Sequence, residues 1–441
     1  MARTYWLETL GCPKNEVDSE KLAARMSTEG LTAASDAAEA DLVVVNTCAF
    51  VEEAREESVA TILELHDMRR EGSELVVTGC MAERYGDELA EALPEVDRIS
   101  GFGISLTGGA ALGAGAVSTP VSLSVRRPPA GAAATGVAAT AEVPDFDLLN
   151  LPRPVSGRPW AYVKVAEGCD KACGFCAIPG FRGPQRSRSV DSVLEEVEQL
   201  AVREAVLVAQ DLGAYGRDGS GGKRRITELF EAVSERVEWV RLLYLYPSEL
   251  RDDLLEAVAA SPVPYFDLSL QHVSEPLVRR MRRPGNGDVY LERIQRIRSL
   301  APHAATRSNF IVGYPGETEA DHDELLAFLE AAQLDWCGFF AYSEEPGTHA
   351  AGLPGTVPEG LVAERLAELR AVADRISAER RDSLIGQELL VLVDESGVAR
   401  SHREAPGIDG VVAVPEHLSV GEFHAVRITD AVGPDLVGVV P

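Results

Sequence analysis

Short apolar runs alternate with amphipathic segments in the first hundred residues of the chain. The runs at 5–10, 41–46 and 74–78 are short enough for strands, and a helical pattern follows each of them. Strand and helix in regular alternation are typical of a parallel α/β sheet. We therefore expect an N-terminal parallel α/β domain over residues 3–115.

A second series of strand signals begins after residue 151. It comprises six apolar runs, at 161–167, 205–210, 240–246, 265–270, 305–312 and 336–342. Amphipathic helical patterns separate them, and one has a capping-box-like start in which Thr318 precedes Asp321 by one turn. Six βα units predict a partial (βα)6 barrel over residues 151–383, related to the TIM barrel, with its functional face at the strand carboxyl ends.

The end of the chain and the region between the two α/β parts have different patterns. Residues 384–441 form short alternating runs separated by Gly and Pro turns, which predict a small antiparallel β-barrel. From about Gly101 to Val143 the chain is rich in Gly, Ala, Pro, Ser and Thr and has no sustained period. We expect a flexible linker at 116–150.

Composition agrees with a multidomain globular protein. The chain has 441 residues, of which 45% are hydrophobic and 25% charged. The N-terminus lacks a basic segment followed by an apolar core, and no stretch is apolar and long enough to span a bilayer. We expect a cytoplasmic protein with no membrane partner.

The charge restricts the class of partner further. Seventy acidic and 42 basic side chains give a net charge of −28, which repels a phosphate backbone and attracts a basic protein. Residues 386–441 contain nine acidic and three basic side chains, so the same preference holds there. A high acidic content that only keeps the protein soluble would give the same totals.

Basic residues are nevertheless dense in three places. We expect most of them in solvated loops or on helix faces, and any that bind would suit an anionic side chain or a phosphate. They are Arg182, Arg186 and Arg188; Lys223 to Arg225; and Arg279, Arg280, Arg282 and Arg283.

Three cysteines within eight residues follow the first strand of the predicted barrel. Cys169, Cys173 and Cys176 have the spacing Cys-x-x-x-Cys-x-x-Cys, which can hold one face of a 4Fe-4S cluster and leave its fourth iron open. An open iron can bind a small molecule through amino and carboxylate groups and pass it an electron. The alternatives are a redox thiol group or a zinc knuckle, but the nearest downstream histidine that could complete a zinc site is His272.

Three further cysteines occupy equivalent positions in the N-terminal domain. Cys12, Cys48 and Cys80 each follow a predicted strand and precede a predicted helix, so a parallel sheet would bring them to one edge. This favours a second three-cysteine cluster site over three independent buried cysteines. Cys337 lies in the apolar run WCGFFAY, and we expect it in the core.

Polar residues also follow or interrupt the strands of the predicted barrel. As a ring around one rim they would suit a zwitterionic nucleoside, which needs donors, acceptors and a few charges around a cavity. These residues are Gln210, Asp211, Tyr215, Ser248, Glu249, Ser269, Gln271, His272, Arg307 and Asn309.

With these features together, the chain resembles the methylthiotransferase family of radical S-adenosylmethionine (SAM) enzymes over its whole length apart from the long Gly/Ala-rich linker. The Cys-x-x-x-Cys-x-x-Cys loop is similar to the radical-SAM signature, and the end of the chain is similar to a TRAM domain. The motifs LGCPKN, VVNTCAF and VTGC resemble the family's auxiliary-cluster domain. LGCPKNEVDSE, GCDKACGFCAIPGFRGPQRSR, SLQHVSEPLVRRMRRPG and FIVGYPGETE resemble the branch that modifies an aspartate of small-subunit ribosomal protein twelve.

The resemblance implies two 4Fe-4S clusters and SAM as cofactors, with no catalytic side chain beyond the cluster ligands. Cys169, Cys173 and Cys176 would hold the cluster that reduces SAM, and Cys12, Cys48 and Cys80 an auxiliary cluster that delivers sulfur. The residues expected around the cluster and SAM are Phe175, Ile178, Gln210, Asp211, Ser269, Gln271 and Arg307.

The implied reaction is methylthiolation of the β-carbon of an aspartate. A deoxyadenosyl radical would remove hydrogen, the auxiliary cluster would supply sulfur, and a further SAM would supply the methyl group. An electron donor such as flavodoxin or ferredoxin would be needed. The alternatives are the same chemistry on an adenosine of transfer RNA, which the negative charge opposes, and a non-catalytic iron–sulfur protein.

Overall fold

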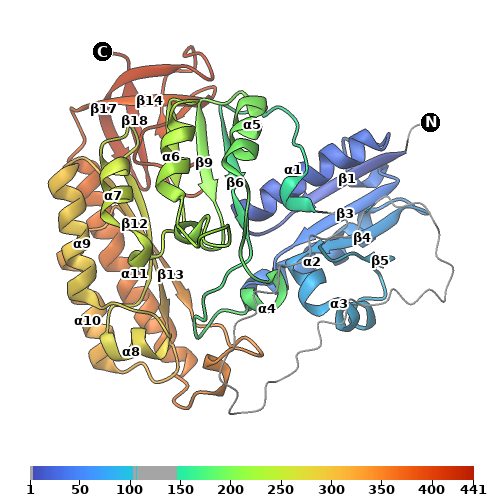
Figure 1. Ribbon diagram of the computed structural model, residues 1–441, viewed down its shortest axis with the longest axis horizontal. Helices are drawn as coiled ribbons and strands as arrows, with labels where there is room; N and C mark the ends of the chain where they lie inside the picture. Colours follow the sequence, from blue (N-terminus) through green and yellow to red (C-terminus); the bar gives the residue numbers. More distant parts are fainter. Residues whose placement is uncertain (1–2, 103–105, 107–146) are drawn as a thin grey trace.

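The computed structural model describes residues 3–102, 106 and 147–441. Figure 1 shows an N-terminal sheet, a central barrel and a C-terminal barrel. Most of the expected linker, up to residue 146, lies outside the described residues. In the described part of the chain, no helix is both long and apolar enough to cross a membrane.

The N-terminal part is a five-stranded parallel sheet in the order β2-β1-β3-β4-β5, which confirms the predicted α/β class. Its pairing puts Thr9 opposite Asn46, and Asn46 opposite Thr78, so the three long strands end at one level. The elements are β1 (Thr4–Thr9), α1 (Pro13–Thr28), β2 (Thr32–Ala33), η1 (Ala37–Glu39), β3 (Leu42–Thr47), α2 (Glu52–Met68), β4 (Glu74–Gly79), α3 (Cys80–Ala92) and β5 (Arg98–Ile99).

The central part is the expected partial (βα)6 barrel. Two three-stranded parallel sheets, β6-β9-β10 and β11-β12-β13, meet at a parallel bridge between Leu245 and Leu268. The barrel therefore stays open between its edge strands, β6 and β13. The strands are β6 (Trp160–Lys164), β9 (Glu204–Val208), β10 (Trp239–Leu242), β11 (Tyr265–Gln271), β12 (Ala305–Val312) and β13 (Trp336–Ala341).

Helices cover the outer face of this barrel. Helix α10 begins with the predicted capping box between Thr318 and Asp321. The helices are α5 (Val190–Leu200), α6 (Ile226–Ser234), α7 (Asp252–Ala259), α8 (Glu275–Arg280), α9 (Gly287–Leu300), α10 (Glu319–Ala332) and α11 (Glu359–Asp382). Shorter elements are η2 (Leu148–Asn150), β7 (Ala166–Glu167), α4 (Ile178–Arg182), β8 (Arg186–Ser187), η3 (Leu212–Ala214), η4 (Pro247–Glu249) and η5 (Ala350–Gly352).

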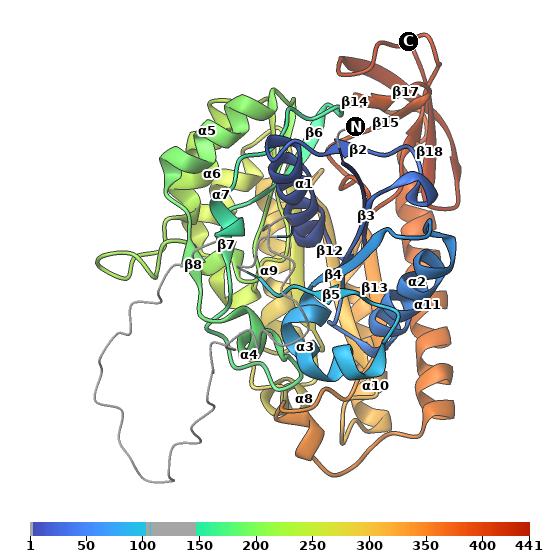
Figure 2. The ribbon, with the colours of Figure 1, turned by 90° about the vertical axis from the view of Figure 1, so that its right-hand side faces the viewer.

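The N-terminal part covers the open side of the barrel (Figure 2). Helix α1 lies against β6, and its Val17 is fully buried in the apolar barrel interior with Tyr162, Val206 and Leu243. At the other edge, the buried carboxylate of Glu345, which follows β13, accepts hydrogen bonds from arginines of α2 and α3. Both edges of the opening are therefore held by the N-terminal part.

The C-terminal part is a closed five-stranded barrel in the order β14-β15-β16-β18-β17. All pairs are antiparallel except β16 with β18, so the purely antiparallel expectation is wrong for this pair. Those two strands share a direction because β17 intervenes in the chain and runs opposite to both. The strands are β14 (Glu388–Glu395), β15 (Val398–Arg400), β16 (Val412–Ala413), β17 (Phe423–Val432) and β18 (Asp435–Val439).

A buried ion group attaches this barrel to the amino ends of the central strands, at the end of the molecule opposite α4 and α8 (Figure 1). Glu204, at the start of β9, is fully buried and accepts from Arg241 Nε at 2.8 Å and from Arg400 Nη1 at 2.7 Å. Arg400 and Arg403, two of the three basic residues of the segment, are thus used internally.

Replacing Glu204 with Gln should destabilise this attachment by about 3 kcal/mol, because two buried guanidinium groups lose their shared carboxylate. The change is measurable as an earlier urea transition of tryptophan fluorescence, since Trp239, one of the four tryptophans, packs on Phe423 of the C-terminal barrel with ring centroids 4.9 Å apart. Arg427→Gln is the control. It breaks a half-exposed pair with Glu388 and should cost less than about 1 kcal/mol.

The destabilisation should also depend on pH. Burial alone would raise the pKa of Glu204, but Arg400 and Arg241 outweigh it and lower that pKa. The carboxylate therefore stabilises the fold above its unfolded pKa of about 4.3, and this contribution falls as the pH drops toward the lower folded pKa. The difference between wild type and Glu204→Gln should shrink below about pH 4, and a difference that stayed constant there would contradict this assignment.

Candidate active site

Cys12, Cys48 and Cys80 lie at one edge of the N-terminal sheet. Cys12 is the N-cap of α1, Cys48 directly follows β3, and Cys80 is the first residue of α3 after β4. The backbone runs close to these thiols, because a Cβ on Gly11 would lie 2.9 Å from Cys48 Sγ. The structure thus brings these three cysteines to the edge where the strand–helix pattern puts them.

Two asparagines fix the loops that carry these cysteines. Asn15 Nδ2 donates to the carbonyls of Leu10 and Thr47, at 3.0 Å each, and so links the ends of β1 and β3 to α1. Asn46 Nδ2 donates to the Asn15 carbonyl at 3.0 Å and to Ser19 Oγ at 2.9 Å. Sequence reasoning missed both asparagines, since amides give no recognisable spacing.

In this first triad, the surroundings favour the deprotonated thiolate more at Cys12 than at Cys48. Burial alone would raise the pKa of Cys12, but the cations of Lys14 and Arg182 outweigh it, so that the pKa is lowered. Burial raises the pKa of Cys48 to about 11. Cys12 and Cys80 also stand at helix N-termini, where backbone N–H groups favour negative charge.

Cys169, Cys173 and Cys176 lie in the loop between β7 and β8, which pair with each other. Gly168 has a φ of +78°, and a Cβ there would lie 2.2 Å from the Pro184 carbonyl oxygen. Cys169 N donates to the Gly183 carbonyl at 3.1 Å, and Gly174 N donates to the Met281 carbonyl at 2.8 Å. The loop is therefore tied both to itself and to the segment after α8.

Nitrogen donors lie against the sulfurs of this second triad. Lys171 N donates to Cys169 Sγ, and Arg283 Nη1 donates to Cys173 Sγ, both at 3.4 Å. Arg283 is buried, so the expectation of a solvated side chain is wrong for it. Burial raises the pKa of Cys169 to about 12 and that of Cys176 to about 11.

The donor set of both triads suits iron–sulfur ligation. All six cysteines are free, and polar N–H groups near sulfur are the contacts that tune such clusters. Among the residues that the structure describes, no three His, Cys, Asp or Glu side chains are arranged to hold a single metal ion.

Gln210 and Asp211 lie just beyond β9 and beside the cysteine loop. Gln210 Nε2 donates to Glu167 Oε1 at 2.7 Å, and Lys171 Nζ lies 3.6 Å from Asp211 Oδ2. Gln210 Oε1 and Asp211 Oδ1 are buried and have no partner among the described residues. Because buried polar atoms are normally paired, these two oxygens suit a polar ligand.

The other expected contact residues are distributed over neighbouring elements. Ser269 and Gln271 lie at the end of β11, where Gln271 has a φ of +75° beside a break in the strand register. Phe175 packs on a small apolar cluster that contains Met281 and Tyr314. Ile178 is the half-buried first residue of α4.

Arg307 does not join this group. It lies near the start of β12, where its Nη1 donates to Asp267 Oδ1 at 3.0 Å and its Nε lies 3.3 Å from Asp409 Oδ1 of the C-terminal barrel. The position of a residue along its strand determines at which end of the barrel its side chain lies. Arg307 is placed toward the amino end, and Asp267 and Asp409 engage its guanidinium.

Cys337, on β13, is half-buried against the core.

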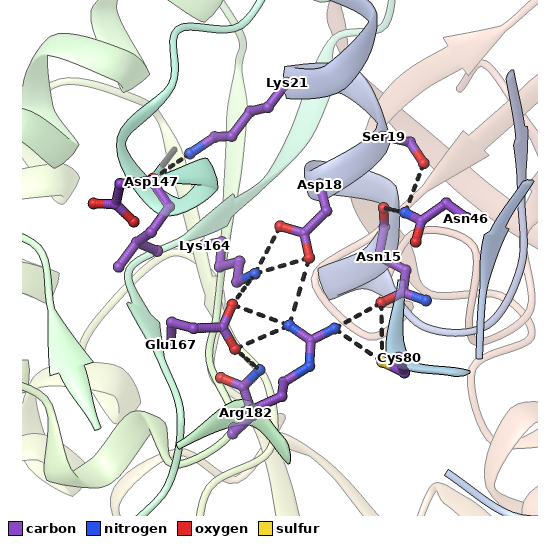
Figure 3. Close-up of polar contacts among 12 residues, drawn as sticks. Asn15, Asp18, Ser19, Lys21, Asn46, Cys80, Asp147, Lys164, Glu167 and Arg182 are labelled. Atoms are coloured by element: carbon purple, nitrogen blue, oxygen red, sulfur yellow. Dashed lines mark hydrogen bonds and ion pairs between the residues drawn. The ribbon is translucent and has the colours of Figure 1, made fainter. Parts of the chain in front are cut away.

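Arg182, the last residue of α4, connects Cys80 of the first triad to Glu167, which lies two residues before Cys169 (Figure 3). Its Nη2 donates to Cys80 Sγ and to Asn15 Oδ1, both at 3.0 Å, while its Nη1 donates to the two oxygens of Glu167 at 2.9 and 3.0 Å. Its side chain is only 3% exposed, so the expectation of a solvated arginine is wrong here too. Nearness to Cys176 in the chain was the available sequence signal.

Two more charges complete this buried group. Lys164 Nζ donates to both oxygens of Asp18 at 2.6 and 2.9 Å and also pairs with Glu167. Asp18 Oδ2 lies 3.5 Å from Arg182 Nη1. Two cations and two carboxylates therefore balance each other at the junction of α1 with the barrel.

Comparison with known proteins gives matches along the whole chain. Residues 4–101 match Uncharacterized protein family UPF0004, residues 163–329 the Radical SAM superfamily, and residues 385–440 the TRAM domain. A ribosomal protein uS12 methylthiotransferase RimO from Cutibacterium acnes is 41% identical over an alignment of 468 positions. The alignment covers 98% of this chain and 97% of the relative. The protein of the same description from Salinispora tropica is 43% identical over 487 residues, covering 99% and 95%.

A solved structure is also similar, with a TM-score of 0.49 and 14% identity over 85% of this chain and 89% of the other. It is a radical S-adenosylmethionine methyltransferase, TsrM, from Kitasatospora setae.

The turn before Cys169 gives a direct test of the second triad. Gly168→Ala should lose most of the iron bound by this loop, because the methyl group forces the backbone away from the Pro184 carbonyl and moves Cys169. Iron per chain after anaerobic reconstitution measures the loss. Gly180→Ala is the matched control, since a Cβ there meets no atom within 4 Å, and equal iron in the two variants would contradict the assignment.

Proposed function

This chain belongs to the family of ribosomal protein uS12 methylthiotransferases, and we propose that it attaches a methylthio group to the β-carbon of one aspartate of uS12. The observation that carries the proposal is a second cysteine triad whose Cys80 is bonded to a buried arginine, which in turn bonds Glu167 just before the Cys169 loop. One triad alone would suit many radical SAM reactions. The second triad adds a place from which sulfur can be delivered.

The reaction requires chemistry that side chains lack, because acid–base groups cannot functionalise an unactivated C–H bond. When bound, SAM and the iron–sulfur clusters supply a 5′-deoxyadenosyl radical, the sulfur and the methyl group. The chain's own residues bind, orient and exclude water. Their contribution is therefore positioning in a dry site.

Cys169, Cys173 and Cys176 would hold the cluster that acts on SAM. The Gly168 turn sets the position of Cys169, and Arg283 donates to Cys173, which supports an anionic sulfur there. The free oxygens of Gln210 and Asp211 would accept hydrogen bonds from SAM, with Asp211 suited to its ammonium group. We place the same ligand near the end of β11 with Ser269 and Gln271, near Phe175 of the cysteine loop, and near Ile178 at the start of α4.

Cys12, Cys48 and Cys80 would hold the auxiliary cluster. Their position at one sheet edge, with two of them at helix N-termini, supports this assignment. Arg182 adds a positive charge at Cys80. The burial of Val17 in the barrel interior supports a reaction space closed to bulk water on the side of α1.

The reaction also needs a one-electron donor, and we include a flavodoxin or ferredoxin in the proposal. Arg282 is exposed on the segment whose Met281 carbonyl accepts from Gly174 of the cysteine loop, while the exposed Arg279 is paired with Glu275. In a chain of net charge −28, Arg282 offers a local attraction for an acidic protein close to the cluster site.

The transfer-RNA alternative is weaker. The relatives are described as acting on a ribosomal protein, and the net charge repels a phosphate backbone. In the C-terminal barrel, burial of Arg400 and Arg403 leaves Arg427 as the exposed basic residue, and it is paired with Glu388. The exposed surface of that barrel therefore suits a basic protein better than RNA.

Mass spectrometry of uS12 tests the reaction and its substrate together. In cells that express this gene, one aspartate of uS12 should gain the mass of a methylthio group, and the gain should be absent in cells that lack the gene. Complementation with wild type should restore it. An unmodified uS12 together with methylthiolated adenosine in transfer RNA would contradict the proposal and favour the alternative.

Cys80→Ala separates the two triads. The variant should still form deoxyadenosine from SAM, because the Cys169 loop is intact, but it should transfer no sulfur to a uS12 peptide. Deoxyadenosine and modified peptide can be quantified in the same reaction by mass spectrometry. Cys337→Ala, which changes a cysteine outside both triads, should keep both products, and sulfur insertion by Cys80→Ala would refute the auxiliary site.

A further inference from the structure

Arg182 contacts both halves of the proposed active site. Resting on the proposed two-cluster function, we propose that Arg182 is a positioning residue that holds Cys80 and Glu167 in one rigid fork and raises the reduction potential of the cluster at Cys80. It would thereby couple the sulfur-donating side of the site to the side that binds SAM.

The planar guanidinium divides its donors between the two domains (Figure 3). Nη2 donates to Cys80 Sγ and Asn15 Oδ1 of the N-terminal domain, while Nη1 donates to both carboxylate oxygens of Glu167 in the barrel and lies 3.5 Å from Asp18 Oδ2 of α1. The fixed angle between these N–H groups sets the direction from Cys80 to Glu167. A lysine carries the same charge but lacks this fork.

The side chain has little freedom to leave this position. It is 3% exposed, the ring of Phe102 lies 4.4 Å from its guanidinium carbon, and Asp18 and Lys164 complete the charge balance around it. Swinging Arg182 outward would leave the two carboxylates of Asp18 and Glu167 to share one cation, that of Lys164. The cost of uncompensated buried charge keeps the fork in place.

Beyond Glu167 the contacts continue into the proposed SAM site. Glu167 Oε1 accepts from Gln210 Nε2 at 2.7 Å, and Glu167 directly precedes the Gly168–Cys169 turn. A continuous chain of hydrogen bonds therefore runs from Cys80 through Arg182 and Glu167 to Gln210. A displacement of the sulfur-donating side would be transmitted to the SAM rim by these bonds.

The effect on potential follows from the N–H bond to a ligand sulfur together with the charge of its donor. Reduction adds an electron to a cluster, and a nearby buried cation or an N–H donor to a ligand sulfur favours the more negative state. Of the three cysteines in this triad, Cys80 receives such a bond from Arg182 at 3.0 Å. The cluster at this triad should therefore be easier to reduce than it would be without the arginine.

Arg182→Lys keeps the positive charge but removes the fork, and with it the N–H bond to Cys80 Sγ that favours the reduced cluster. In the reconstituted full chain, redox titration followed by electron paramagnetic resonance should show a lower potential for the auxiliary cluster and an unchanged potential for the other. We expect at least a tenfold fall in the ratio of reduced to oxidised auxiliary cluster at fixed applied potential, which corresponds to about 59 mV for one electron. Iron per chain should equal that of wild type.

Glu167→Gln tests the same Arg182–Glu167 contact from its other end. It replaces Arg182→Lys as the test if that variant binds no clusters. Removing the carboxylate leaves Arg182 less neutralised, so the potential of the auxiliary cluster should rise. Opposite shifts from the two variants would not arise from a general loosening of the interface. An unchanged auxiliary potential in Glu167→Gln would overturn the coupling.

Arg158→Lys is the matched control. Arg158 also joins the barrel side to α1, through Glu16 and Glu20, but it contacts no cysteine, so neither potential should move. Full iron with unchanged potentials in Arg182→Lys would overturn the inference and leave the proposed function intact. A wild-type chain with iron for one cluster and a single potential would overturn both, and the wild type alone would reveal it.

Discussion

The open side of the six-stranded barrel is the constraint on which the rest of the molecule depends. Six strands cannot close on themselves here, and their inward-facing apolar side chains would meet water unless another element covered them. Helix α1 fills this gap with Val17, and Leu392 and Ala405 of the C-terminal barrel join the same apolar cluster. Because Cys12 is the N-cap of α1, the packing that buries the barrel interior also decides where the first cysteine lies.

Charge pairing makes this packing specific. Hydrophobic burial alone has no direction, but Lys164, Arg182, Asp18 and Glu167 are all withdrawn from water at the junction. Breaking a buried pair by a shift of α1 costs about 3–5 kcal/mol, so one register of helix against barrel is favoured. In that register Arg182 bonds both Cys80 and Glu167, the residue that precedes the Gly168–Cys169 turn.

The two ends of the barrel have separate tasks. The strand carboxyl ends carry the cysteine loop and the unpartnered oxygens of Gln210 and Asp211. The C-terminal barrel lies at the other end of the central strands (Figure 1). There the amino ends hold it through Glu204 and its arginines, and Arg307 pairs with Asp409 at the same end. The acidic C-terminal barrel is therefore attached away from the cysteine loop. Its charge can attract a basic partner over a distance, but other residues must line the reaction site.

The sequence by itself determined the elements and the positions of the cysteines relative to them. Period and spacing are local properties, so the strands, the capping box at Thr318 and the placement of Cys12, Cys48 and Cys80 after three parallel strands could be predicted. The partial barrel followed from counting βα units, and the family followed from motifs. Contacts between distant segments have no such local signal.

Only the tertiary structure decided the rest. It buried Arg182 and Arg283 against cysteine sulfurs, although a run of basic residues in sequence is usually solvated. It put Arg307 at the amino end of its strand and paired β16 with β18 in parallel. The physical reason is the same in each case, because a charged side chain or a strand edge takes the partner that long-range packing brings to it.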